Sequence, residues 1–469
     1  MARMTDYASS SPDHTPIENR QKSAAGVEYA HTQWLRVWTI IFAGIVAALH
    51  IGKAPIAVPL LRQDLGLSLA FASWIIGAYA IIGAVAGLPA GMLISFVGAR
   101  RSLVIGLLVI GAASCAGALA TSGPTLLVTR VLEGAGFLMV AIGAPMLLRM
   151  LTAAKDRDSV FGWWAIYFTA GSVIAMLAGP LVARFGWQSL WYTTGLLSLA
   201  YSGVAWFAAP LAPKAALSGE RALRDFARIM RAPGTILLAL AFGFYSLQYH
   251  ALSGLLPSLL VERLEVSIAE AGGISAASIV VSGLGAVTAG FLLRQGVPLW
   301  AIIASAFSFM GLVTFGIFHA SMPLLGVAAL GIASLGATGF VPASIYAAAP
   351  KFAPDSAMLA LTVGCLVQAS HLGHVLGPSA LGALVEHFGW SGAPALFVGA
   401  EIETSPERQR KIDSVGGNPE AGEHPPDRHR AEIGKQIDQE IAVHGVGSNA
   451  RIAIRLLIAM IPLTSLRAK

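Results

Sequence analysis

Charged residues are scarce in this chain. Asp, Glu, Lys and Arg make up 12% of its 469 residues, whereas soluble domains carry roughly 25%. Hydrophobic residues make up 55%, and the mean hydropathy is +0.69. Because so few charges cannot cover a water-exposed surface, the composition excludes an ordinary soluble domain and indicates a membrane protein.

Cysteine is also scarce, and signatures of enzymes are lacking. Cys115 and Cys365 lie inside apolar stretches, which excludes a disulfide framework. The chain has no Cys/His spacing for a metal, no phosphate-binding Gly-rich loop after a strand and no nucleophile triad. We therefore expect no metal, no cofactor and no catalytic residue, and we do not expect ATP to be an energy source.

Long apolar runs are what the chain does have. A helix needs roughly 20 apolar residues to cross a bilayer, and the chain carries eleven such runs. They are 35–61, 69–94, 102–121, 124–151, 159–183, 189–209, 234–260, 271–293, 298–318, 322–348 and 357–385. The N-terminal tail is polar up to Gln33, so we expect no cleavable signal peptide and a multi-pass protein.

The basic residues predict the orientation. With a cytoplasmic N-terminus, the outer loops receive only Arg62, Arg184 and Arg263, and the inner loops receive Arg100, Arg101, Arg149, Lys155, Arg157, Lys214, Arg221, Arg224, Arg228, Arg231, Arg294 and Lys351. Positive charge is retained on the cytoplasmic side of membranes. The net charge of +6 thus reflects topology, and we expect no nucleic-acid partner.

The chain divides into two halves. We predict a cytoplasmic tail (1–33), a six-helix bundle (34–209), a cytoplasmic linker (210–233), a second bundle (234–400) and a polar C-terminal tail (401–469). The segment "AGPLVARFGWQSLW" at 178–191 is echoed by "LGPSALGALVEHFGWSGAP" at 376–394. Parallel repeats of six spans are typical of one class of transporters, which bind substrate between the halves.

Two motifs give the chain a family resemblance. "RVLEGAG" at 130–136 resembles the fourth helix of the major facilitator superfamily, and "GMLISFVGARR" at 91–101 resembles its loop between helices two and three. The resemblance implies an all-α membrane protein of two pseudo-symmetric six-helix bundles. It also implies a gating loop, formed here by Gly91, Ser95, Gly98, Arg100 and Arg101.

The gating loop departs from the family pattern. Ser95 replaces its acidic residue, and the matching loop of the second half, "GFLLRQG" at 290–296, has Arg294 there. A charge relay is therefore in doubt, and Arg100 and Arg101 have the alternative role of anchoring the loop to lipid phosphates.

Resemblances to subgroups of the superfamily suggest different kinds of transport. "PLLRQDLGLS" at 59–68 and "GWWAIYFTAGS" at 162–172 resemble cyanate and nitroimidazole permease relatives. The spacing of Gly364, Gly373, Gly377 and Pro378 is associated with antiporters, which suggests export.

The predicted twelfth helix is incomplete. It begins near Gly392 and meets a polar tract at Glu401, a length below half the bilayer core. The change in composition fits a frameshifted, fused or replaced C-terminus, and the alternative is a natural disordered tail.

Ionisable residues within spans usually mark a transport pathway. His50 and Lys53 lie three apart on helix one, hence on one face. The resemblance places helices one, four, seven and ten around a central cavity, where Lys53 would bind an anion. The alternative is that Lys53 extends to the headgroups.

Arg130 and Glu133 share a face of helix four and could form an internal pair. Glu133 would couple transport to protons, because its protonation would release Arg130 for substrate. The alternative is a purely structural pair.

Further candidates lie on helices five, seven and eleven. On helix seven we expect substrate contacts from Tyr245, Gln248, Tyr249 and His250, with packing as the alternative. Helix–helix hydrogen bonding is favoured for Gln368, His371 and His374, and packing is favoured over ligand stacking for Trp163, Trp164 and Tyr167.

The sequence as a whole predicts a secondary active transporter. We expect proton-coupled alternating access, a small-molecule substrate that is a small anion, and a monomer in the lipid bilayer of a bacterial inner membrane. One alternative is proton-coupled export of drug-like compounds. Another is a membrane sensor or scaffold that moves no solute.

Overall fold

The computed structural model describes residues 31–87, 97–210, 228–355 and 358–397, which contain helices and no strand. The first half comprises α2 (Trp34–Leu65), α3 (Leu69–Gly77), η1 (Ala78–Ala80), α5 (Ala99–Ala118), α6 (Gly123–Leu151), η2 (Ala154–Asp156), α7 (Arg157–Ala165), α8 (Tyr167–Met176), α9 (Gly179–Phe185) and α10 (Trp187–Ala208). The second half comprises α12 (Pro233–Leu264), α13 (Ile268–Arg294), α14 (Leu299–Ile317), α15 (Leu324–Thr338), α16 (Phe340–Phe352), α17 (Leu359–Phe388) and η4 (Trp390–Gly392).

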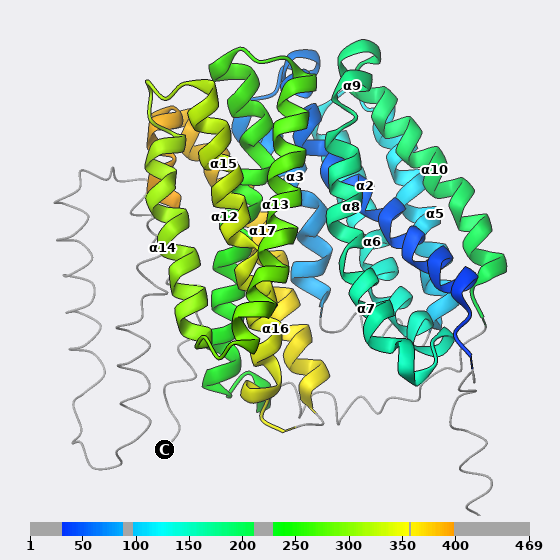
Figure 1. Ribbon diagram of the computed structural model, residues 1–469. Coiled ribbons are helices and arrows are strands. Elements are labelled where there is room, and N and C mark those ends of the chain that lie inside the picture. Colours follow the sequence, from blue (N-terminus) through cyan, green and yellow to red (C-terminus); the bar gives the residue numbers. More distant parts are fainter. Residues whose placement is uncertain (1–30, 88–96, 211–227, 356–357, 398–469) are drawn as a thin grey trace, which may run out of the picture.

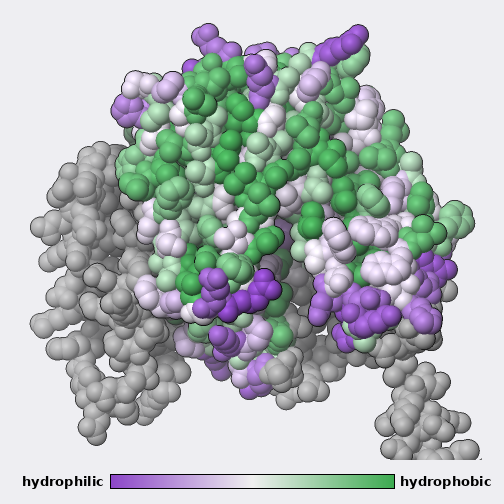
Figure 2. Space-filling model, viewed as in Figure 1, coloured by the Kyte–Doolittle hydropathy of each residue, from purple (hydrophilic) through white to green (hydrophobic). Residues whose placement is uncertain are grey.

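The helices have the lengths that a bilayer requires. Within the described ranges, nine are long and apolar enough to cross a membrane. Two further predicted spans are α10, with 22 residues, and α17, with 30 residues, both above the roughly 20 that a span needs. Figure 2 shows apolar residues over the middle of the molecule and polar residues at its two ends. The prediction of an all-α membrane protein is confirmed.

Three predicted spans are not single α-helices. The run at 69–94 is interrupted by η1 after α3. The run at 159–183 is divided into α7, α8 and α9, and the run at 322–348 is divided into α15 and α16 at Gly339. The apolar pattern continues through each break, so the sequence predicted one helix in each place. The end of span two (88–94) and the predicted tail after residue 400 lie outside the described residues.

Close helix packing depends on glycine in the first half. A Cβ atom at Gly136 of α6 would lie 2.6 Å from the carbonyl oxygen of Gly106 in α5. The backbones of these helices therefore touch, an approach that only small residues allow.

The two halves lie side by side in Figure 1, with α2 and α5 to α10 on the right, α12 to α17 on the left, and α3 in the middle. Helix α3 packs against α17, and α8 packs against α13. Central helices of each half therefore form the interface between them.

Polar contacts join the halves at one end. Arg62 pairs with Glu262, and the backbone N–H of Ala70 donates to Glu386 Oε2 at 2.8 Å. All four residues lie at the end predicted to be extracellular. Figure 2 shows a furrow between the halves in the lower part of the view, towards the other end.

Candidate functional site

Four ionisable side chains meet in the interior of the first half. His50 and Lys53 come from α2, Arg130 and Glu133 come from α6, and each is 0% exposed. Lys53 Nζ lies 2.9 Å from Glu133 Oε1, and Arg130 Nη1 lies 2.5 Å from Glu133 Oε2. Residues three apart lie on the same face of a helix, so His50 and Lys53 of α2 both face α6, and Arg130 and Glu133 of α6 both face α2. The predicted Arg130–Glu133 pair is therefore present, and Glu133 binds a second cation as well.

Backbone carbonyls and aromatic rings complete the surroundings of the cations. The Arg130 guanidinium donates to the carbonyl of His50 at 2.8 Å and to the carbonyl of Ile75 at 3.2 Å. It also lies over the Tyr79 ring at 4.7 Å. Arg130 thus ties α6 to both α2 and α3.

The three N–H groups of Lys53 have three partners. Besides Glu133, Nζ donates to Ser114 Oγ at 2.7 Å and to His50 Nδ1 at 2.9 Å. An ammonium group only donates, so His50 Nδ1 must accept and its proton must lie on Nε2. His50 Nε2 then donates to Ser198 Oγ at 2.9 Å. Lys53 is saturated in this conformation, with no donor left for a substrate.

The charges of this cluster do not balance. With each group in its ordinary ionisation state, Lys53 and Arg130 carry two positive charges, Glu133 carries one negative charge, and His50 is neutral in the tautomer described above. Burying an uncompensated charge is costly. The cluster therefore attracts one further negative charge.

A small cavity of about 20 Å³ lies between the halves, close to the cluster. Its walls come from α2, α3 and α8 of one half and from α12, α13 and α17 of the other. Ile51 and Ile76 are wall residues, and Arg130 donates to the carbonyls of the residues just before them, His50 and Ile75. The excess positive charge thus lies directly behind the cavity wall.

Two polar groups of the cavity wall lack partners. Ser172 Oγ from α8 and His250 Nε2 from α12 are buried without a hydrogen bond among the described residues, and both residues line the cavity. The His250 ring is held by stacking on His374, with ring centroids 3.6 Å apart. A cavity of this size accommodates about one water molecule. A polar ligand group could pair with both halves at once.

Comparison with known proteins decides the family. A family model described as Major Facilitator Superfamily matches residues 40–362. The chain belongs to the Major Facilitator Superfamily. Proteins of this superfamily are membrane transporters rather than enzymes.

Relatives of the chain include a protein named as a transporter and proteins named for resistance to antibiotics. It is 27% identical over 363 residues to the 3-(3-hydroxy-phenyl)propionate transporter of Escherichia coli, covering 75% of this chain and 87% of that protein. It is 28% identical over 223 residues to the puromycin resistance protein pur8 of Streptomyces alboniger, covering 46% and 42%. It is 29% identical over 151 residues to the methylenomycin A resistance protein of Bacillus subtilis, covering 31% and 32%. The chain thus matches less than half the length of the two resistance proteins.

Solved structures share the fold. A mutant of the peptide transporter POT, in complex with sulfate, has a TM-score of 0.66 at 16% identity, covering 84% of this chain and 99% of that one. A bacterial homolog of the human lysosomal transporter Spinster, inward-facing and unoccupied, has a TM-score of 0.64 at 17% identity, covering 78% and 94%. This similarity supports the superfamily fold of two helix bundles.

The candidates on helix seven differ in their positions. Tyr249 and His250 line the cavity. Tyr245 is stacked between Phe242 and Tyr249, and Gln248 Nε2 donates to the carbonyl of Phe397 at 2.9 Å. Only the first two therefore border the space between the halves.

The cavity walls differ from those implied by the family resemblance. Helices one and seven, α2 and α12, contribute walls as expected, whereas the fourth and tenth helices, α6 and α15–α16, are not among the lining elements. Arg130 and Glu133 of α6 lie behind the wall, because Arg130 is held by carbonyls of α2 and α3.

On helices five and eleven, most candidates pack or join helices. Gln368 Nε2 donates to the carbonyl of Ala84 at 2.8 Å, a bond between the halves. His371 Nδ1 lies 2.8 Å from the carbonyl of Val367 in its own helix. Trp164 and Tyr167 stack with centroids 4.1 Å apart, and Trp163 lies against Trp38 at 5.6 Å.

One alternative is wrong: Lys53 does not extend to the headgroups, because it is 0% exposed and paired with Glu133. Four residues of the site were not predicted from the sequence: Ser114, Ser172, Ser198 and Trp191. Lys53 Nζ lies over the Trp191 ring at 4.5 Å. A single serine or tryptophan in an apolar helix has no pattern that distinguishes it from a packing residue.

The predicted gating loop is described only in part, because Gly91 and Ser95 lie outside the described residues. Gly98 precedes α5 with φ at +91°, a conformation that favours glycine. Arg100 lies over the Trp206 ring at 4.3 Å, and Arg101 is exposed. No three His, Cys, Asp or Glu side chains gather as a metal site within the described ranges.

Proposed function

We propose that this chain transports a small organic anion together with a proton by alternating access. The observation that carries the proposal is the excess positive charge of the buried cluster, directly behind the wall of the cavity between the halves. An anion supplies the missing negative charge. Because the cavity of about 20 Å³ holds little more than one water, the halves must separate to admit it.

Glu133 is the group that links the anion to a proton. It is bonded to both cations, so a bound carboxylate must compete with it for Lys53 or Arg130. Protonation of Glu133 removes that competition. One proton and one anion taken up together leave the charge of the cluster unchanged, which favours electroneutral cotransport.

An aromatic carboxylate fits the walls best. Phe168, Tyr249, His250 and His374 all line the cavity, and flat rings favour stacking or edge contacts with a flat ligand. Ser172 Oγ and His250 Nε2 are available for a ligand hydroxyl. The relative named as a 3-(3-hydroxy-phenyl)propionate transporter matches over 75% of this chain, which supports the same class of substrate.

Export of drug-like compounds is a second candidate. The aromatic walls favour it, as do the relatives named for resistance to puromycin and methylenomycin A. Such compounds need no carboxylate, so they would not depend on Lys53. We also propose that the protein acts as a monomer in a bacterial inner membrane.

Proteoliposome flux tests the proposal. With labelled 3-(3-hydroxyphenyl)propionate and an inwardly directed proton gradient, we expect concentrative uptake. Lys53→Ala should abolish substrate binding and Lys53→Arg should retain part of it, because the site requires positive charge. Glu133→Gln should keep counterflow and lose pH-driven accumulation, because exchange needs no net proton movement. Lys351→Gln, which removes an exposed cation at the end of α16 in the other half, serves as the control.

Three results would contradict parts of this scheme. Binding without flux would indicate a sensor. Uptake that is unchanged in Lys53→Ala would exclude the anion site and favour the drug-like alternative. Full pH-driven accumulation in Glu133→Gln would remove Glu133 from the coupling step.

A further inference from the structure

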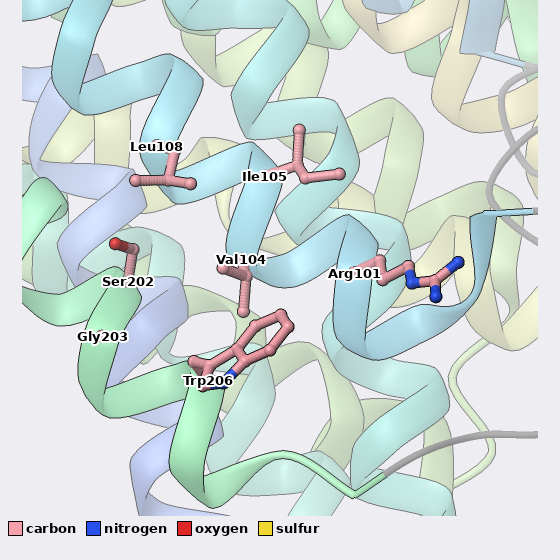
Figure 3. A pocket seen from close by; sticks show the side chains of 7 residues that line it. All are labelled: Arg101, Val104, Ile105, Leu108, Ser202, Gly203 and Trp206. Atoms are coloured by element: carbon pink, nitrogen blue, oxygen red, sulfur yellow. The ribbon is translucent and has the colours of Figure 1, made fainter.

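A second and larger hollow lies on the side of the first half, and it shares no lining residue with the cavity between the halves. This groove has a volume of about 530 Å³ and lies between α5 and α10. Figure 3 shows its walls: Val104, Ile105 and Leu108 stand on α5, and Ser202, Gly203 and Trp206 stand on α10. Arg101 lies at one end, and its guanidinium points outward, away from Trp206. The groove is thus apolar along its length and cationic at its end.

The groove exists because α5 and α10 diverge. At Gly111 the helices touch, since a Cβ atom there would lie 2.8 Å from the carbonyl oxygen of Gly195. Two turns further along α10, a Cβ atom at Gly203 would meet nothing within 4 Å. The space widens towards the start of α5 and the end of α10, which is one end of the membrane-spanning bundle.

The open end has the chemistry of a membrane interface. Trp206 is 47% exposed, and tryptophan is enriched where lipid headgroups begin. Arg100 covers the Trp206 ring at 4.3 Å, and its Nε has no hydrogen-bond partner among the described residues. Arg101 is exposed and has no ion-pair or hydrogen-bond partner in the described part of the chain.

The first turn of α5 strengthens the positive field at this end. Gly98 precedes the helix, and no side chain caps its N–H groups. A helix N-terminus carries partial positive charge, which adds to the charges of Arg100 and Arg101. The segment 97–118 contains no acidic residue that could neutralise them.

We propose that the groove binds one anionic phospholipid. An acyl chain lies along Val104, Ile105 and Leu108 over Gly203, and the phosphate lies beside Arg101 at the start of α5. Basic sites between membrane helices are where anionic headgroups bind. This site is independent of the substrate cavity, and it gives Arg101 a partner that the described part of the protein does not supply.

Native mass spectrometry of the purified full chain in detergent tests the site. Phosphatidylglycerol and phosphatidylcholine with identical acyl chains are titrated separately, and the dissociation constant of the first bound lipid is measured. Arg101→Gln should weaken phosphatidylglycerol binding by about fivefold, the contribution of one arginine at a membrane surface, and should leave phosphatidylcholine unaffected. Arg101→Lys should retain most of the affinity.

Gly203→Leu tests the apolar part, since a Cβ atom there would meet nothing within 4 Å and the rest of the leucine would occupy the groove. It should weaken binding of both lipids. If it yields no folded protein, Ile105→Trp on the opposite wall replaces it. Matched controls come from α13: Gly290 is also a helical glycine with open space around it, and Arg294 is also exposed. Gly290→Leu and Arg294→Gln should bind phosphatidylglycerol as the unmodified chain does.

The proposal is overturned by any of three results. These are equal affinity for the two lipids in the unmodified chain, unchanged phosphatidylglycerol binding in Arg101→Gln, or equal losses in the α13 controls. The last result would mean that lipid binds to the hydrophobic surface in general.

Discussion

The buried cluster holds two cations and one carboxylate, so Glu133→Gln and Lys53→Met should lower the unfolding free energy by different amounts. Glu133→Gln removes the carboxylate that contacts Lys53 and Arg130, at 2.9 and 2.5 Å, and leaves two buried cations. Breaking a buried ion pair in this way costs about 3–5 kcal/mol of unfolding free energy. Lys53→Met instead leaves Arg130 paired with Glu133 and the cluster neutral.

The cost of Lys53→Met should therefore be smaller. It deprives His50 Nδ1 of its donor, and an unsatisfied buried polar group costs about 1–3 kcal/mol. Ser114 loses little, because its Oγ still donates to the carbonyl of Trp191 at 2.7 Å. Methionine fills most of the volume that the lysine stem occupied.

The double variant tests the coupling between the two positions. Glu133→Gln with Lys53→Met leaves Arg130 alone, with the same net charge as the unmodified cluster. The double loss should fall short of the summed single losses by about 0.5–3 kcal/mol, the range for side chains that share one network. Titration of sodium dodecyl sulfate into mixed micelles, followed by tryptophan fluorescence, measures all three values.

Arg294→Gln is the control, since loss of an exposed charge should change stability by no more than about 0.5 kcal/mol. A Lys53→Met variant as unstable as Glu133→Gln would refute the count of two cations against one carboxylate. Strict additivity in the double variant would show that Lys53 and Glu133 do not interact in the membrane.

Two further predictions concern topology and packing. A cysteine placed at Ser218 in the predicted cytoplasmic linker should resist a membrane-impermeant maleimide in intact cells, and rapid labelling there would reverse the predicted orientation. Gly136→Leu should lower the unfolding free energy by at least about 1–3 kcal/mol, because the larger side chain forces α6 away from α5. Thermal melting measures this against Gly290→Leu, a position with open space around it. Equal melting temperatures for the two variants would show that the contact at Gly106 is not tight.

The membrane-spanning helices could be predicted from the sequence because the bilayer sets a minimum length of apolar sequence for each one. Any segment that crosses it needs about 20 apolar residues with internally paired backbone. The rule did not reveal the interruptions at η1, Ile166 and Gly339, where the predicted single helices are broken. Hydropathy does not change at such breaks, so the pattern of apolar residues cannot reveal them.

The sequence by itself determined that the chain crosses a membrane repeatedly, that its superfamily motifs lie on helix four and in the loop between helices two and three, and that Arg130 and Glu133 share a face. Periodicity and motif spacing suffice for these. Only the tertiary structure decided that Lys53 reaches the same carboxylate from α2. Only it brought Ser172 and His250 from opposite halves to one cavity, and only it opened a groove where α5 and α10 diverge. The physical reason is that packing at residues such as Gly111 and Gly195 sets the rotation and tilt of one helix relative to another. The pattern of polar and apolar residues along a single helix does not specify which helix packs against it.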